Sequence, residues 1–192
     1  MKKSIGAQTI LYPTPVLIVG VYDKKNQPNL MTVAWGGICN SQPPSVAISL
    51  REATYTYGCL TAHQGFTINI PSVDQVKEAD YVGMSSGRSV NKFDELKLTP
   101  VKSTLVNAPY IQEFPMVLEC KVVHTFKLGL HTQFVGEILD IKVDESGLDS
   151  QGRPDIERIR PFCYAPGNQA YYAIGPCLGQ AFSIGRRDTI QF

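Results

Sequence analysis

The sequence has no surplus of charge of either sign. Its 18 lysine and arginine residues balance 17 aspartate and glutamate residues, which leaves a formal net charge of +1. A protein so close to neutral has no general field that attracts nucleic acid or an anionic lipid surface. Its basic residues form no cluster either, because Lys24–Lys25 and Arg186–Arg187 are isolated pairs. We therefore expect no nucleic-acid partner.

Long apolar runs are also absent. No uninterrupted run approaches the roughly 20 residues that a helix needs to span a bilayer. The first residues, Met1 to Ala7, carry charge but lack the apolar stretch of a signal peptide. These two absences predict a cytoplasmic protein without a membrane partner.

Cysteine is present in an odd number and without a metal-binding pattern. The five cysteines are widely spaced, and none belongs to a Cys-x-x-Cys motif. This spacing argues against a disulfide framework and against a zinc or iron–sulfur site. Cys120 lies in an apolar run and has the character of a small buried hydrophobe. Cys39 follows Trp35-Gly-Gly and can lie near a cofactor, but packing is the favoured explanation of this residue and a redox role is the alternative.

Glycine-rich nucleotide fingerprints are missing too. No Gly-x-Gly-x-x-Gly follows a candidate strand, and no Gly-Lys-Ser/Thr occurs. Backbone amides in those motifs hold the phosphates of dinucleotides and nucleoside triphosphates. A Rossmann-type reductase is therefore not expected.

What the sequence does contain is a succession of short β-type runs. Alternating or continuous apolar residues with β-branched and aromatic character predict strands, and helical periodicity appears in only two segments. The expected strands are 16–22, 30–35, 46–50, 66–70, 116–127 and 131–143, and the expected helices are 53–63 and 72–83. Gly36–Gly37 is expected to form a bend, and Pro43–Pro44 a turn or strand edge. The pattern predicts one mainly β domain over residues 1–192, closer to a barrel than to a doubly wound sheet.

A group of hydroxyl and cationic side chains follows the strand at 46–50. It comprises Ser49, Arg51, Thr54, Tyr55, Thr56 and Tyr57. An arginine can donate two parallel hydrogen bonds to a phosphate, and small hydroxyls can donate to its other oxygens. A helix that begins at 53 adds the positive end of its dipole. An apolar strand beside a phosphate site suits a flat phosphorylated cofactor, and a buried hairpin with a polar loop has the same pattern.

Several segments resemble the flavin reductase-like family of FMN-binding split barrels, and most closely its flavoredoxin type. The resemblance covers residues 12–141, and no single segment carries it alone. The segments are Pro15-Val-Leu-Ile-Val-Gly-Val-Tyr, Pro28-Asn-Leu-Met-Thr-Val-Ala-Trp, Pro43-Pro-Ser-Val-Ala-Ile-Ser-Leu, Gly65-Phe-Thr-Ile-Asn-Ile-Pro and His131-Thr-Gln-Phe-Val-Gly-Glu-Ile.

The resemblance implies a six-stranded, Greek-key-like split barrel with a few inserted helices. It also implies a homodimer with FMN near the subunit interface. The residues that match the family's cofactor-binding segments are Asn29, Met31, Thr32, Val33, Ala34, Trp35, Ser49, Leu50, Arg51, Thr54, Tyr55, Thr56 and Lys92. A flavin ring is flat and amphipathic, so an apolar strand with accessible backbone amides can hold it. No metal site is expected.

Four of these residues also have simpler explanations. Trp35 can be a core or interface aromatic, and Asn29 can merely hold the turn after Pro28. Arg51 can be a solvent-exposed arginine above a helix cap. Lys92 can be an ordinary surface lysine.

His131 is the candidate catalytic residue. Many flavin reductases have Gly-Asp-His-Thr at the matching position, with the histidine near the nicotinamide, whereas this chain has Gly129-Leu-His-Thr. A neighbouring carboxylate orients an imidazole and raises its basicity, which Leu130 cannot do. The leucine leaves a role in NAD(P)H oxidation open, and it fits a flavoredoxin-like electron carrier at least as well as a dedicated flavin reductase. His63 and His124 have no ligand spacing and are expected to be structural.

The expected function is electron transfer through bound FMN. As an enzyme, the protein would pass a hydride from NAD(P)H to the flavin. The alternatives are an electron carrier that exchanges electrons with a redox partner protein and a module that stores or senses flavin.

Overall fold

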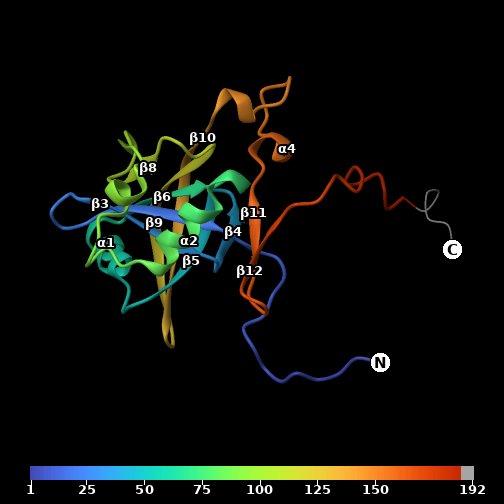
Figure 1. The fold of residues 1–192 in the computed structure, drawn as a ribbon, viewed down its shortest axis with the longest axis horizontal. Coiled ribbons are helices and arrows are strands. Elements are labelled where there is room, and N and C mark those ends of the chain that lie inside the picture. The colour runs from blue at the N-terminus through green and yellow to red at the C-terminus, as the bar shows by residue number, and fades with distance from the viewer. Residues whose placement is uncertain (187–192) are drawn as a thin grey trace.

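The computed structural model describes residues 1–186, and its centre is a seven-stranded antiparallel sheet that curves into a barrel (Figure 1). The strand order is β3-β2-β6-β9-β10-β5-β4. The strands are β2 (Leu17–Tyr22), β3 (Pro28–Val33), β4 (Gly36–Ser41), β5 (Pro44–Arg51), β6 (Gly65–Ile70), β9 (Met116–Leu128) and β10 (His131–Val143).

The barrel closes through one bent strand. Only Ala34 and Trp35 separate β3 from β4, yet β3 pairs with β2 and β4 pairs with β5. The backbone amide of Ser49 on β5 also donates to the carbonyl of Trp35, at 2.9 Å. Counting β3 and β4 as one bent strand gives the six strands that the sequence resemblance implied, so the predicted mainly β split barrel is confirmed.

The bend predicted at Gly36–Gly37 is wrong in one respect. These two glycines begin β4, which forms a hairpin with β5 through a turn at the cis Gln42–Pro43 bond.

The expected helices are present, as α1 (Tyr55–His63) and α2 (Val76–Met84), the latter preceded by the 3₁₀ turn η1 (Val73–Gln75). The short helices α3 (Lys92–Leu96) and α4 (Ile156–Ile159) were not predicted.

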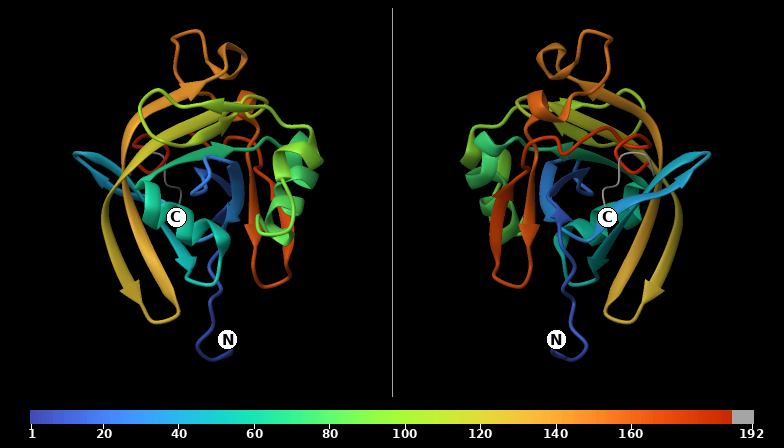
Figure 2. Two further views of the ribbon diagram at one scale, coloured as in Figure 1. Left: turned by 90° about the vertical axis from the view of Figure 1, so that its left-hand side faces the viewer. Right: turned by 90° about the vertical axis from the view of Figure 1, so that its right-hand side faces the viewer.

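Smaller elements surround the barrel. Strands β1 (Thr14–Pro15), β11 (Phe162–Ala165) and β12 (Ala170–Ala173) form a separate three-stranded sheet, and β7 (Pro100–Lys102) pairs with β8 (Pro109–Ile111). A second 3₁₀ turn, η2 (Glu145–Gly147), follows β10. Figure 2 shows the β9–β10 hairpin extending well beyond the barrel. Residues 1–11 and 174–186 leave the barrel as extended arms (Figure 1).

Two apolar clusters stabilise this arrangement. One fills the barrel and includes Val19, Ile48, Leu60, Phe66 and Phe134. The other packs α2 and α3 against the outer face of β2 and β3. Within residues 1–186, no helix is long and apolar enough to cross a bilayer.

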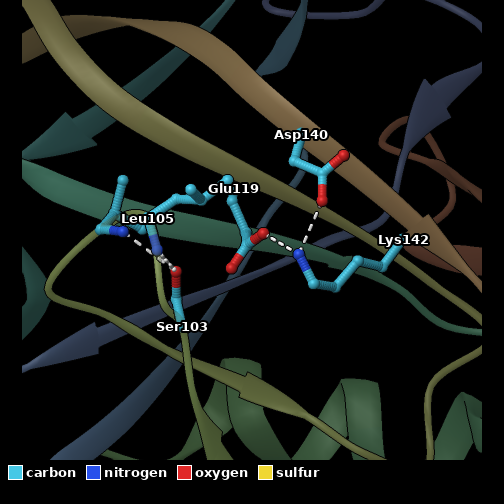
Figure 3. A network of polar contacts seen from close by, with 6 residues as sticks. Ser103, Leu105, Glu119, Asp140 and Lys142 are labelled. Atoms are coloured by element: carbon cyan, nitrogen blue, oxygen red, sulfur yellow. Dashed lines mark hydrogen bonds and ion pairs between the residues drawn. The ribbon is translucent and has the colours of Figure 1, made fainter.

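One charged group lies under the loop at 103–109, on the outer face of β9. Glu119 is fully buried, and its Oε2 accepts a hydrogen bond from Nζ of Lys142, which also donates to Asp140 at 2.7 Å (Figure 3). The nearby hydroxyl of Ser103 accepts from the amide of Leu105, at 3.0 Å. A buried carboxylate needs such a partner because burial without one is costly. The group lies on β9 and β10, away from the cavities described next.

Candidate functional site

A cavity of about 200 Å³ lies where the start of α1 meets the segment that follows α2. Strand β3 supplies its floor, and α3 closes its inner side. Its lining combines glycine, hydroxyl and cationic residues, which is the chemistry of an anion site. The lining residues are Met31, Ala53, Thr54, Tyr55, Thr56, Val82, Gly83, Ser85, Ser86, Gly87, Arg88 and Lys92.

The amino end of α1 forms one side of this cavity. Thr54 is the N-cap, and its Oγ1 accepts from the amide of Tyr57 at 3.3 Å. The carbonyl of Arg51 accepts from both the amide and the hydroxyl of Thr54, at 3.0 and 2.9 Å. The turn at 51–54 therefore fixes the direction in which α1 leaves β5. The first amides of α1 have no partner within the helix, and its dipole favours an anion at this end.

Asn29 and Thr56 connect β3 to α1. Both are buried, and Nδ2 of Asn29 donates to Oγ1 of Thr56 at 3.0 Å. Asn29 Oδ1 faces Gly87, where an added β-carbon would clash with it and with the ring of Tyr55. Only glycine fits at position 87, because the segment after α2 passes so close to β3.

Lys92 is buried rather than on the surface. Its Nζ donates to the carbonyls of Leu30 and Val82, at 2.8 and 2.7 Å. Burial lowers the pKa of Lys92 to about 8. The bond to Val82 also covers a carbonyl at the carboxyl end of α2, which would otherwise repel an anion. An ammonium group has three protons, so one remains for a ligand in the cavity.

Arg88 lies at the mouth of the cavity. Its Nη1 donates to the carbonyl of Ala53 at 3.0 Å, and its guanidinium lies 5.8 Å from the ring centroid of Tyr55. The hydroxyl of Tyr55 donates to Asp23 Oδ2 at 2.7 Å, and this bond is the main cause that raises the pKa of Tyr55 to about 12. The tyrosine therefore stays neutral and fixed, and Arg88 rests on it as a positioned cation.

A second hollow of about 300 Å³ lies on the other side of Gly83. Gly83 lines both spaces, so together they follow β3. Thr32 donates to the carbonyl of Ala79 at 2.6 Å, and Tyr171 donates to Asp80 Oδ1 at 2.9 Å. Burial and this bond to Asp80 raise the pKa of Tyr171 to about 12. The lining is Val16, Thr32, Ala34, Asp80, Gly83, Met84, Tyr164, Gln169 and Tyr171.

Trp35 and His131 form a pair beyond the end of β3. Their ring centroids lie 4.6 Å apart with an interplanar angle of 41°. Trp35 is 42% exposed, so it is not a core residue. His131 begins β10 directly opposite Arg51 on β5, and the exposed Arg51 side chain does not line the cavity.

The structure thus divides the predicted site residues into four groups. Met31, Thr54, Tyr55, Thr56 and Lys92 line the smaller cavity, and buried Asn29 holds Thr56 there. Thr32 and Ala34 line the larger hollow, while Trp35, Ser49, Arg51 and His131 lie around the β3–β4 bend and the facing strand ends. Val33 and Leu50 point into the barrel core, which leaves only their backbone for a ligand.

Sequence reasoning missed several lining residues. Gly83 was predicted only as part of the helix at 72–83, and the Ser85–Arg88 segment was not predicted as part of the site. Their mixture of glycine, serine and arginine was the available signal, because it matches phosphate-binding loops. Tyr164 and Tyr171 gave no signal, since they reach the site only through the β11–β12 hairpin.

Cys39 and Cys120, which the sequence analysis singled out, line neither cavity. Cys39 is exposed on β4, and Cys120 is buried in the barrel core. Within residues 1–186, no three histidine, cysteine or acidic side chains are grouped so as to hold a metal ion.

Comparison with known proteins identifies this architecture. Residues 9–172 match the flavin reductase like domain. The structure is similar to flavoredoxin of Desulfovibrio vulgaris (Miyazaki F), with a TM-score of 0.93 and 53% identity over 97% of this chain and 100% of that one. Flavoredoxin from Methanosarcina acetivorans has a TM-score of 0.91 and 31% identity, with 97% and 98% covered. An uncharacterized protein of Archaeoglobus fulgidus is 34% identical over 148 residues, which are 76% of this chain and 80% of that protein. The chain belongs to the flavin reductase-like family, and within it to the flavoredoxin type.

Proposed function

We propose that the protein binds FMN along β3 and transfers electrons through it. The phosphate would occupy the cavity at the start of α1, and the ring would lie toward the β3–β4 bend. The observation that carries this proposal is the grouping of a helix amino end, Thr56, Arg88 and Lys92 around one cavity.

The chemistry of this cavity fits a phosphate monoester. Two cations oppose its charge, and the α1 amides and the hydroxyl of Thr56 can donate to its oxygens. A volume of about 200 Å³ accommodates the phosphate and the start of the ribityl chain. Riboflavin, which lacks the phosphate, would leave both cations without an anionic partner.

The surroundings of β3 fit an aromatic ring system. Ala34, Met84 and Tyr164 offer apolar and aromatic surface, and Thr32 and Gln169 offer polar groups in the same hollow. When bound, FMN supplies a ring that accepts and releases electrons, which protein side chains cannot do themselves. The chain's own part is to hold that ring, exclude water from one face and leave an edge accessible.

We propose that His131 and Trp35 border the accessible edge. The imidazole packs against the ring of Trp35 at a tilt, and Leu130 beside it offers no carboxylate. This arrangement supports positioning of a reductant such as NAD(P)H by contact rather than by proton transfer. It also suits a carrier that receives electrons from a redox partner protein. We further propose that residues 1–192 act as one domain and that the protein is a homodimer.

The visible absorption spectrum of the purified protein tests this function. The enzyme hypothesis predicts a flavin spectrum that NADH or NADPH bleaches within seconds. The carrier hypothesis predicts a flavin spectrum that resists pyridine nucleotides but bleaches with a reduced redox protein. Flavin that is bound but reduced by neither would indicate storage or sensing, and failure to bind added FMN would contradict the whole proposal.

A further inference from the structure

The carboxyl-terminal arm has the composition of a buried segment. Residues 174–185 contain no charged side chain, yet the arm runs away from its own barrel (Figure 1). Leu178 is 88% exposed and Phe182 is 98% exposed. Exposed apolar residues are ordinary one at a time, but an uncharged arm that presents two large ones is typical of an interaction segment.

An apolar groove lies beside the start of this arm. Its volume is about 750 Å³, and it forms between the amino-terminal segment and the β11–β12 hairpin. Ile10, Tyr12 and Pro13 form one wall, and Cys163, Tyr164 and Tyr172 form the other. Tyr12 packs directly on Gly167, where a β-carbon would clash with the tyrosine hydroxyl. The two walls are therefore in direct contact at one end, and this contact fixes the shape of the groove.

Groove and arm match in chemistry. All the lining side chains of the groove are uncharged, as are those of the arm. Aromatic walls suit leucine and phenylalanine, because burial of their surface removes apolar area from water on both sides. A charged segment would lose its hydration in such a groove without gaining a partner.

We propose that the arm of one subunit docks in the groove of a second copy of this chain, and that the exchange is reciprocal. Each subunit carries one arm and one groove, so a twofold axis satisfies both contacts with none left open. Tyr172 lines the groove and Ile174 begins the arm, which places both contacts close to that axis. The inference rests on the proposed homodimer and is independent of FMN.

Two native cysteines test the contact directly. Cys163 lines the groove, and Cys177 is exposed on the arm next to Leu178. Treatment of the full-length protein with diamide, which oxidises two thiols to a disulfide, should yield a covalent dimer on a non-reducing gel. Cys163→Ser and Cys177→Ser should each reduce that dimer to background, whereas Cys39→Ser, which removes another exposed thiol, should leave it unchanged.

Three outcomes of the cross-linking would overturn the proposal. A covalent dimer that survives Cys163→Ser would show that the cross-link does not involve the groove. A disulfide between Cys163 and Cys177 within one monomer would show that the arm covers its own groove. Absence of any cross-link in a protein that sediments as a dimer would place the arm elsewhere.

Sedimentation equilibrium gives an independent measurement. Phe182→Ser removes an apolar anchor from both arms of the dimer, so the dimer dissociation constant should rise by about tenfold or more. Leu105→Ser, at another exposed leucine on the loop at 103–109, should leave the constant unchanged. Equal constants for all three proteins, or a monomeric wild type, would contradict arm exchange. Bound FMN in a monomeric protein would refute this inference and the proposed homodimer but leave the proposed FMN binding intact.

Discussion

The side-chain amide of Asn29 donates a 3.0 Å hydrogen bond to the hydroxyl of Thr56, in a buried position between β3 and α1. The threonine oxygen is used as the acceptor, so its own proton is available for another acceptor. The strand that would carry the flavin ring and the helix that would meet its phosphate are thus held in one fixed relation.

Thr56→Val should weaken both the fold and FMN binding. The substitution keeps the shape of the side chain and leaves the buried amide of Asn29 without its acceptor. Loss of that acceptor should lower the free energy of unfolding by about 1–3 kcal/mol. FMN affinity should fall about tenfold or more, because the lost hydrogen bond is one to a charged phosphate and is worth about 1.5–3 kcal/mol. Urea denaturation and fluorescence titration measure the two effects.

Thr61→Val is the matched control for this change. Thr61 lies on the same helix but is exposed, and its hydroxyl donates to the carbonyl of Tyr57. It should alter neither FMN affinity nor stability by more than about 0.5 kcal/mol. Equal effects of the two valine variants would show that the Asn29–Thr56 bond has no special role.

The lowered pKa of Lys92 predicts that the free energy of unfolding and the FMN affinity change with pH in opposite directions. Burial lowers its pKa from 10.5 to about 8, so between pH 8 and 10.5 the unfolded chain binds more protons than the folded one. The contribution of this residue to the free energy of unfolding of the FMN-free protein should therefore rise with pH in that window. A phosphate favours the charged amine, so FMN affinity should fall with pH over the same range.

Lys92→Met should remove both trends, whereas Lys77→Met, at an exposed position of α2, should keep them. Riboflavin serves as the ligand control because it has no phosphate to meet the amine. If FMN and riboflavin affinities respond identically to pH from 8 to 10, Lys92 does not contact the phosphate.

Two arginines are expected to differ in their contribution to FMN binding. Arg88 lines the cavity, and loss of one charged hydrogen bond is worth about 1.5–3 kcal/mol, so Arg88→Ala should weaken FMN binding by about tenfold or more. Arg51→Ala should weaken it by a smaller factor, because its exposed side chain must reach inward from the end of β5. Arg158→Ala, on exposed α4, is the surface control. Isothermal titration calorimetry measures the FMN affinity of each variant. A larger loss of affinity in Arg51→Ala than in Arg88→Ala would show that the phosphate lies nearer to β5.

His131→Ala should slow reduction by NAD(P)H at least tenfold while leaving FMN affinity within about twofold. The imidazole packs against the ring of Trp35 beyond the end of β3 and does not line the phosphate cavity. Stopped-flow absorbance of the flavin measures the rate, and His124→Ala, on β9 against Phe126, is the control. An unchanged rate would make His131 a structural residue.

The main strands were predictable because each has a clear apolar pattern. The hairpin of β2 and β3 and the pair of β9 and β10 lie where their patterns predicted them. Strand β4 was missed because Gly36-Gly-Ile-Cys-Asn-Ser has neither alternation nor burial, and its pairing with β5 makes it a strand. Tertiary pairing decides such a segment, and local propensity does not.

The candidate site was predictable in its residue types but less so in its geometry. The burial of Lys92 depends on two carbonyls, of Leu30 and Val82, which come from other elements and leave no trace near position 92. The Trp35–His131 pair likewise depends on the bend between β3 and β4. Arg88 was overlooked because its role comes from Tyr55, which lies far away in the sequence.

Comparison of FMN with riboflavin tests the central claim most directly, because the two ligands differ only by the phosphate. Fluorescence titration of the flavin-free protein at pH 7 should give an FMN dissociation constant at least about 100-fold lower than that for riboflavin, since at least two charged hydrogen bonds depend on the phosphate. Equal dissociation constants, or no binding of FMN, would contradict the assignment of the cavity at the start of α1.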